Sequence, residues 1–288
     1  MAHASVRDAL GAAIDALAAA EVEEPRLDAE LLLAEAAGAD RAALVADPGA
    51  EVSPAAGRRF GEMVRRRLRR EPVAYILGRR GFRNIELGVD RRVLIPRPET
   101  ELLVELALER RPRKLLDVGT GSGAIALAVA DELPDCEVVA TDTSPAALEV
   151  ARANAARLGL ADRVRFLDGT VPEGEPFDLI LANLPYVAER DWPSLQPELT
   201  RWEPREALLA GPDGLDAYRI FFAELGRHSA ECQCILSPSG RQNACAVAVE
   251  VGEGQAPGLV GLFAEAGFGS IERRRDLAGV ERVVLGEA

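Results

Sequence analysis

The spacing of apolar residues changes near residue 80. From Val6 to about Leu68, apolar residues recur every three or four positions, and Pro25 and the Asp47-Pro48-Gly49 turn separate short segments of this pattern. Such spacing is typical of helices that bury one face. We therefore expect residues 1–78 to form a small all-helical N-terminal domain.

The next segment has a different pattern. Between Gly81 and Ile95, apolar residues alternate around Gly88-Val89-Asp90, which predicts a β-hairpin within a connector of residues 79–98. Two prolines follow, and a helix is expected to start near Thr100 and to continue through Leu102–Leu108.

After the connector, short apolar runs alternate with helical stretches. Ser144 followed by Pro145 predicts a helix start, and Gly159 predicts its end. This alternation is typical of a parallel sheet with crossover helices, so residues 99–288 should form a doubly wound α/β domain. The expected strands are 114–118, 137–141, 164–167 and 177–182, and the expected helices are 124–133 and 145–158.

Composition excludes several classes of protein. The 288 residues carry a net charge of −13, which argues against a stable nucleic-acid partner held by bulk electrostatics. No apolar run approaches bilayer-spanning length and no signal segment is recognisable, so we expect a cytoplasmic protein without a membrane partner. The four cysteines and two histidines lack the spacing of a metal site, and no metal is expected.

A glycine-rich loop follows the first strand of the α/β domain. Alternate glycines allow a ligand to approach the backbone, and open α/β sheets bind ligands at the carboxyl ends of their strands. Asp142 ends the next strand, 19 residues after Gly123, where a carboxylate can hold both ribose hydroxyls. Gly169, after the third strand, is expected near an adenine. The loop residues predicted to bind a cofactor are Gly119, Thr120, Gly121, Ser122 and Gly123.

Two cofactor classes fit this loop. A dinucleotide fingerprint is G-x-G-x-x-G, whereas the loop reads G-x-G-x-G and follows Asp117 by two positions. An acid there suits a cationic ligand better than a pyrophosphate. S-adenosylmethionine carries a sulfonium and an ammonium group, so the loop favours this cofactor and a Rossmann-like methyltransferase sheet.

The tetrapeptide Asn183-Leu184-Pro185-Tyr186 follows the last predicted strand. The Asn183 side chain and a neighbouring carbonyl can accept hydrogen bonds from a planar NH2 group, and the Tyr186 ring can stack on that group. The alternative is an ordinary turn, since Asn-x-Pro is also common there. If the motif acts on a ligand, it predicts a substrate with an amide or amino nitrogen, and Asn183 would lie beside the cofactor.

These motifs together resemble the HemK/PrmC family of N5-glutamine methyltransferases, which modify peptide chain release factors. The resemblance spans almost the whole chain and is carried by 26–33, 71–78, 94–101, the glycine loop, 183–186, 203–208 and 213–215. It implies that the glycine loop, Asp142 and Gly169 bind S-adenosylmethionine. It also implies that residues 183–186 bind the glutamine of the Gly-Gly-Gln motif in class 1 release factors.

The chain departs from the family pattern in two places. The family usually has Asn-Pro-Pro-Tyr, and Leu184 replaces the first proline while keeping the backbone carbonyl. Between Cys232 and Val249 the chain looks lengthened, with Ser237 to Asn243 intervening before a strand expected at 244–251. The second departure leaves the cofactor and substrate motifs untouched, because both precede it.

Two other functions are compatible with the motifs. A nucleic-acid base carries the same kind of amino group, but base flipping would normally be supported by a basic groove. A non-catalytic S-adenosylmethionine-binding protein would also keep the glycine loop. The N-terminal domain shows no catalytic constellation, and we expect it to dock the protein partner.

Overall fold

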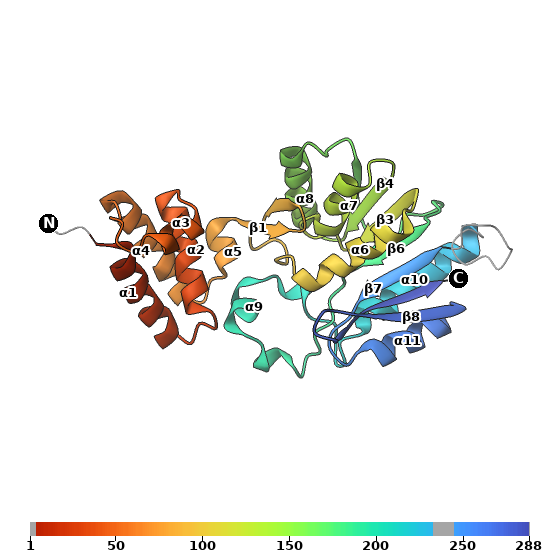
Figure 1. Ribbon diagram of the computed structural model, residues 1–288. Helices are drawn as coiled ribbons and strands as arrows, with labels where there is room; N and C mark the ends of the chain where they lie inside the picture. Colours follow the sequence, from red (N-terminus) through yellow and green to blue (C-terminus); the bar gives the residue numbers. More distant parts are fainter. Residues whose placement is uncertain (1–3, 233–244, 288) are drawn as a thin grey trace. The chain divides into compact units, whose positions relative to one another are not determined.

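The computed structural model describes residues 4–232 and 245–287, and the chain divides into two compact units (Figure 1). A helical unit comprises Met1–Arg79 together with Gln196–Trp202. A second unit comprises Arg80–Leu195 and Glu203–Ala288. The unusual stretch predicted from Ser237 to Asn243 lies outside the described residues.

The helical unit is built on short, individually capped helices. Ser5 and Asp8 form a capping box at the first helix, and Gly38 ends the second in a left-handed conformation. Leu17 and Phe60 are buried in one apolar core of this unit. The predicted helical pattern is therefore confirmed, with α1 (Val6–Ala19), α2 (Pro25–Ala37), α3 (Arg41–Ala46), α4 (Pro54–Leu68) and α5 (Val73–Leu77).

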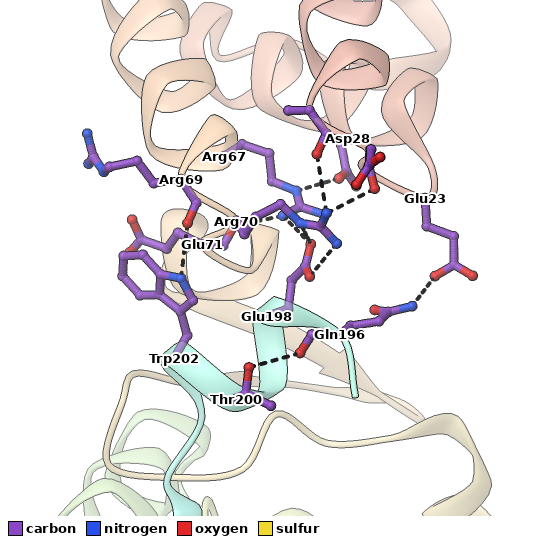
Figure 2. Close-up of polar contacts among 12 residues, drawn as sticks. Glu23, Asp28, Arg67, Arg69, Arg70, Glu71, Gln196, Glu198, Thr200 and Trp202 are labelled. Atoms are coloured by element: carbon purple, nitrogen blue, oxygen red, sulfur yellow. Dashed lines mark hydrogen bonds and ion pairs between the residues drawn. The ribbon is translucent and has the colours of Figure 1, made fainter. Parts of the chain in front are cut away.

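A later segment of the chain completes this unit. Helix α9 (Pro197–Trp202) brings Glu198 to two arginines, with oxygen–nitrogen distances of 2.7 Å to both Arg67 and Arg70 (Figure 2). Arg67 also pairs with Asp28 at 2.6 Å. Burial alone would raise the pKa of Glu198, but hydrogen bonds from Arg70 and Arg67 outweigh it and lower that pKa. The segment is thus held by a charge-balanced network.

The second unit contains a seven-stranded sheet in the order β5-β4-β3-β6-β7-β9-β8. Its first five strands in this order are mutually parallel. Strand β9 pairs antiparallel with β7, and β8 pairs antiparallel with β9. The α/β prediction is confirmed, whereas β8 and β9 were not predicted. The strands are β3 (Lys114–Val118), β4 (Glu137–Asp142), β5 (Val164–Asp168), β6 (Leu179–Ala182), β7 (Ala246–Glu250), β8 (Ser270–Arg275) and β9 (Glu281–Glu287).

Helices cover both faces of this sheet. Leu115 packs with α6 (Glu101–Arg110), α7 (Ala124–Glu132) and α8 (Pro145–Leu158) on one face, and Leu116 packs with α10 (Asp216–Cys232) and α11 (Ala256–Glu265) on the other. Because successive strand residues point to opposite faces, the apolar strand is buried on both sides. Short 3₁₀ turns lie at η1 (Pro98–Thr100), η2 (Trp192–Ser194) and η3 (Arg205–Ala207).

The hairpin is shorter than predicted, and it turns between Phe82 and Ile85 instead of around Gly88-Val89-Asp90. It consists of β1 (Arg79–Phe82) and β2 (Ile85–Gly88), so the expectation that extended pairing reaches Ile95 is wrong. The reason is a turn, because the Asp90 carbonyl accepts from Val93 N and the Asp90 side chain accepts from Arg92 N. In the described part of the chain, no helix is long and apolar enough to cross a membrane.

Candidate active site

The carboxyl ends of the parallel strands meet at one edge of the sheet. The chain passes from β3 outward through β4 to β5 and then returns to place β6 on the other side of β3. Ligands of open α/β sheets bind at such a reversal. A cavity of about 330 Å³ lies there. Of the predicted site residues it is lined by Gly119, Thr120, Gly121, Ser122, Asp142, Gly169, Asn183, Leu184 and Pro185.

The glycine loop has a backbone that other residues adopt only with strain. Gly119 and Gly123 have φ angles of 73° and 85°. A Cβ atom on Gly123 would lie only 2.8 Å from Leu127 Cδ1, so this glycine serves close packing of α7 rather than the cavity wall. Four of the five predicted loop residues therefore line the cavity, whereas Gly123 does not.

Asp117 supports the loop from behind. It is fully buried, and its Oδ2 accepts from Thr120 Oγ1 at 2.6 Å and from Ala126 N at 3.1 Å. Oδ1 has no hydrogen-bond partner among the described residues. Burial raises the pKa of Asp117 to about 7, and hydrogen bonds from Thr120 and Ala126 oppose the rise. Its charge would act on a cationic ligand through the loop, since Asp117 does not line the cavity.

Asp142 ties β4 to the glycine loop. Its Oδ2 accepts from Gly121 N at 2.9 Å and its Oδ1 accepts from Ser144 N at 2.8 Å. Burial raises the pKa of Asp142 despite these two bonds, and the Asp168 charge adds to the rise. Each carboxylate oxygen has a further lone pair, so Asp142 can still accept from two hydroxyl groups in the cavity.

The Asn-Leu-Pro-Tyr motif lies beside the glycine loop. Leu184 Cδ2 is 3.0 Å from the position of a Cβ on Gly119, so the two motifs meet. The Tyr218 hydroxyl lies 3.3 Å from the Leu184 carbonyl oxygen but makes a closer hydrogen bond to the Glu250 carbonyl. The Leu184 carbonyl therefore keeps acceptor capacity. Tyr186 does not line the cavity, and it packs against the core beneath α10 and α11.

Several residues around the cavity were not predicted from the sequence to belong to the site. Arg97 pairs with Glu203 at 2.5 Å, and Glu203 also accepts from Ile95 N at 3.0 Å, which fixes the proline-rich segment before η1. Thr100 accepts a hydrogen bond from Asn183 Nδ2 at 3.0 Å. Glu250 ends β7 beside the motif, and the signal for it was an acid at the end of an apolar strand.

The residues present fit S-adenosylmethionine. Asp142 offers acceptors for ribose hydroxyls, and the unpartnered Oδ1 of Asp117 marks an excess of negative charge behind the loop. The cavity walls are mainly apolar, as expected for an adenine ring and the methylene groups of a methionine chain. Fold and site together define a methyltransferase that uses S-adenosylmethionine as its methyl donor.

Comparison with known proteins narrows this class. The family model for the PrmC N-terminal domain matches residues 8–78, and the methyltransferase small domain matches residues 98–199. The release factor glutamine methyltransferase of Caulobacter vibrioides is 41% identical, covering 96% of this chain and 93% of that protein. That of Moorella thermoacetica is 41% identical over 98% of each chain. The chain belongs to the release factor glutamine methyltransferase family.

Solved structures support the fold alone. The catalytic domain of human Mettl16, solved with an RNA hairpin of the MAT2A 3′UTR, matches with a TM-score of 0.52. The match covers 69% of this chain and 75% of that one at 14% identity. Identity this low carries no information about the substrate.

Proposed function

We propose that this protein transfers the methyl group of S-adenosylmethionine to the side-chain amide nitrogen of the glutamine in the Gly-Gly-Gln motif of class 1 peptide chain release factors. The observation that carries the proposal is how near Leu184 lies to the glycine loop: Leu184 Cδ2 is 3.0 Å from where a Cβ on Gly119 would lie, and both residues line the cavity. The names of relatives about 40% identical over nearly the full length support the same substrate. A cytoplasmic location is part of the proposal, since release factors work there.

Bound cofactor supplies an electrophilic methyl group on a sulfonium. We assign its binding to Gly119, Thr120, Gly121, Ser122, Asp142 and Gly169, with Gly123 shaping the loop and Asn183 beside it. Asp142 would hold the ribose, because an acceptor-only carboxylate suits two hydroxyl donors.

In the substrate part of the site, Asn183 and Leu184 orient the amide. Asn183 Oδ1 and the Leu184 carbonyl would accept the two N–H bonds of the glutamine side chain and aim its nitrogen at the methyl group. An amide lone pair is delocalised into the carbonyl, so positioning and stabilisation of growing positive charge contribute most of the catalysis. When the nitrogen–carbon bond forms and the sulfur–carbon bond breaks, the nitrogen becomes acidic and loses a proton to water.

Pro185 and Tyr186 would shape the motif. Pro185 keeps Leu184 in extended geometry, which compensates for the missing first proline of the family pattern. Tyr186 is proposed to form one side of the amide pocket, although its ring packs mainly into the core. We retain 1–78, 79–98 and 99–288 as the proposed domains, and we propose that the first of them docks the release factor.

A direct test is methyl transfer to purified release factor from labelled cofactor. We expect label on the natural protein and none on a version whose Gly-Gly-Gln glutamine is alanine. Asn183→Ala should lower transfer by about a thousand-fold, because it removes an acceptor that acts on the reacting group, while cofactor affinity changes little. Equal label on both release factors, or label on RNA or DNA only, would contradict the proposal.

A further inference from the structure

A line of polar groups extends from Asn183 through Thr100, which also lines the cavity, to Glu250, which does not line it. Asn183 Nδ2 donates to Thr100 Oγ1 at 3.0 Å, and the Thr100 side chain in turn hydrogen-bonds the Glu250 carboxyl. Tyr186 also donates to Glu250, at 3.3 Å to Oε1. Thr100 and Glu250 are 3% and 1% exposed. The two ends of the Asn-Leu-Pro-Tyr motif are therefore joined through one buried carboxyl.

The direction of these hydrogen bonds follows from the groups themselves. An ionised carboxylate can only accept, so the Thr100 hydroxyl must give its single proton to Glu250. Thr100 Oγ1 can then only accept from Asn183. Asn183 must present its NH2 group to Thr100, which leaves Oδ1 free for the cavity. Without the carboxylate, a hydroxyl could equally donate to Oδ1, and the amide could turn over.

No arginine or lysine forms an ion pair with Glu250 among the residues that the structure describes, and its Oε2 has no hydrogen-bond partner there. The Tyr218 hydroxyl contacts the backbone carbonyl of Glu250 instead of the carboxyl. Glu99 and Arg282 act on the carboxyl at longer range and in opposite directions. A buried carboxyl without an ion-pair partner costs stability. Setting the direction of the hydrogen bonds from Asn183 and Thr100 is a role that explains why Glu250 lies there.

We propose that Thr100 and Glu250 are positioning residues that hold the Asn183 amide with its oxygen toward the substrate. The proposal rests on the proposed function, since it concerns the acceptor that binds the glutamine NH2 group. Neither residue needs to touch the methyl group. Their effect is on the fraction of enzyme in which Asn183 can accept, and thus on turnover more than on cofactor binding.

The proposal predicts a pH dependence. Burial raises the pKa of Glu250 to about 7, and hydrogen bonds from Thr100 and Tyr186 oppose the rise. Below that pH the protonated carboxyl is a weak acceptor and no longer fixes the Thr100 proton. The turnover number kcat should therefore rise with pH through about 7. Asp117 titrates in the same range, so the measurement needs saturating cofactor.

The hydrogen bonds from Asn183 through Thr100 to Glu250 form a relay, and three variants test it with release factor as substrate. Thr100→Val removes the acceptor for Asn183 and should lower kcat by about 10- to 100-fold. Thr100→Ser keeps the hydroxyl and should retain most of the kcat of the unmodified protein. Glu250→Gln can donate as well as accept, so kcat should be low and nearly independent of pH between 6 and 9. Cofactor affinity and thermal unfolding check that each variant is folded.

The outcomes separate this proposal from the proposed function. If Asn183→Ala abolishes transfer while Thr100→Val keeps kcat within about two-fold of the unmodified protein, the relay is wrong and the function stands. If kcat of Glu250→Gln still falls at low pH as it does in the unmodified protein, the relay is wrong as well. If Asn183→Ala has no effect, the amide-binding role itself fails. The pH profile of the unmodified protein needs no variant, and a flat kcat from pH 6 to 9 would contradict the role of Glu250.

Discussion

Buried carboxylates occur in both units, but their partners differ. In the helical unit, Glu30 pairs with Arg26 and Arg41 at 2.9 Å each, and Glu198 pairs with Arg67 and Arg70. For both acids, burial would raise the pKa, and the arginine hydrogen bonds outweigh it and lower the pKa. Asp28 differs, because burial raises its pKa in spite of Arg67.

Around the cavity of the second unit, the buried Glu203 pairs with Arg97, whereas three other acids have no ion-pair partner among the residues that the structure describes. Asp117, Asp142 and Glu250 accept from backbone N–H groups or from hydroxyls, and burial raises the pKa of each. The difference teaches how to recognise the site in this fold. An acid with an arginine partner belongs to the scaffold, whereas an unpaired buried acid is completed by a proton or by a cationic ligand.

The largest expected effect is on stability of the helical unit. Glu198→Gln leaves the buried Arg67 and the half-buried Arg70 without their shared carboxylate, and we expect the free energy of unfolding to fall by about 3 kcal/mol. Chemical denaturation monitored by circular dichroism measures this change. The exposed Glu62→Gln on α4 is the control and should change stability by less than about 0.5 kcal/mol. If both variants lower the free energy of unfolding equally, the arginine-paired Glu198 does not stabilise the scaffold in the way proposed.

Asp142→Asn should act on cofactor affinity instead. Asparagine has one acceptor oxygen, so it cannot hold Gly121 N, Ser144 N and the ribose hydroxyls together. We expect binding to weaken by about 10- to 100-fold, the effect of losing a charged hydrogen bond, as measured by calorimetry. The neighbouring Asp168→Asn is the control, because Asp168 is exposed and pairs in register with Asp142. If Asp168→Asn weakens cofactor binding as much as Asp142→Asn does, the loss reflects the removal of any nearby negative charge and not the hydrogen bonds of Asp142.

The smallest effect is proton release on cofactor binding. The pKa of Asp117 is raised to about 7, so the folded protein is stabilised below the ordinary pKa of an aspartate and loses this contribution as pH rises through 7. A cationic ligand favours the ionised form, and binding at pH 7 should release up to about half a proton. Calorimetry in two buffers of different ionisation enthalpy measures it. The release of protons on cofactor binding should vanish in Asp117→Asn and persist in Glu250→Gln.

Local signals in the sequence predicted much of the fold. Ser144 caps α8 through Ala147 N, and Gly159 ends it in a left-handed conformation, as the sequence indicated. The strand predicted at 177–182 is confirmed only from Leu179, and the Asp178 carboxylate just before it accepts from Arg113 N and Lys114 N. Such short-range chemistry can be read along the chain.

Long-range partnerships could not be read in that way. Thr100 and Glu250 are 150 positions apart, and only the placement of β7 beside β6 brings the end of one strand to Asn183. Nothing in the pattern of 196–202 indicates that α9 joins the helical unit, since its partners Arg67 and Arg70 lie within a basic run that also fits a solvated helix face. These contacts depend on tertiary structure.

The Gln196–Trp202 segment makes the helical unit discontinuous in sequence. Three peptide connections join it to the rest of the protein, after Arg79, before Gln196 and after Trp202. A fragment that ends at residue 79 would retain Arg67 and Arg70 without Glu198. The remaining fragment would retain Glu198 without these two arginines. Two stretches separated by more than a hundred residues thus supply charges that need each other, and the helical unit is complete only when both are present.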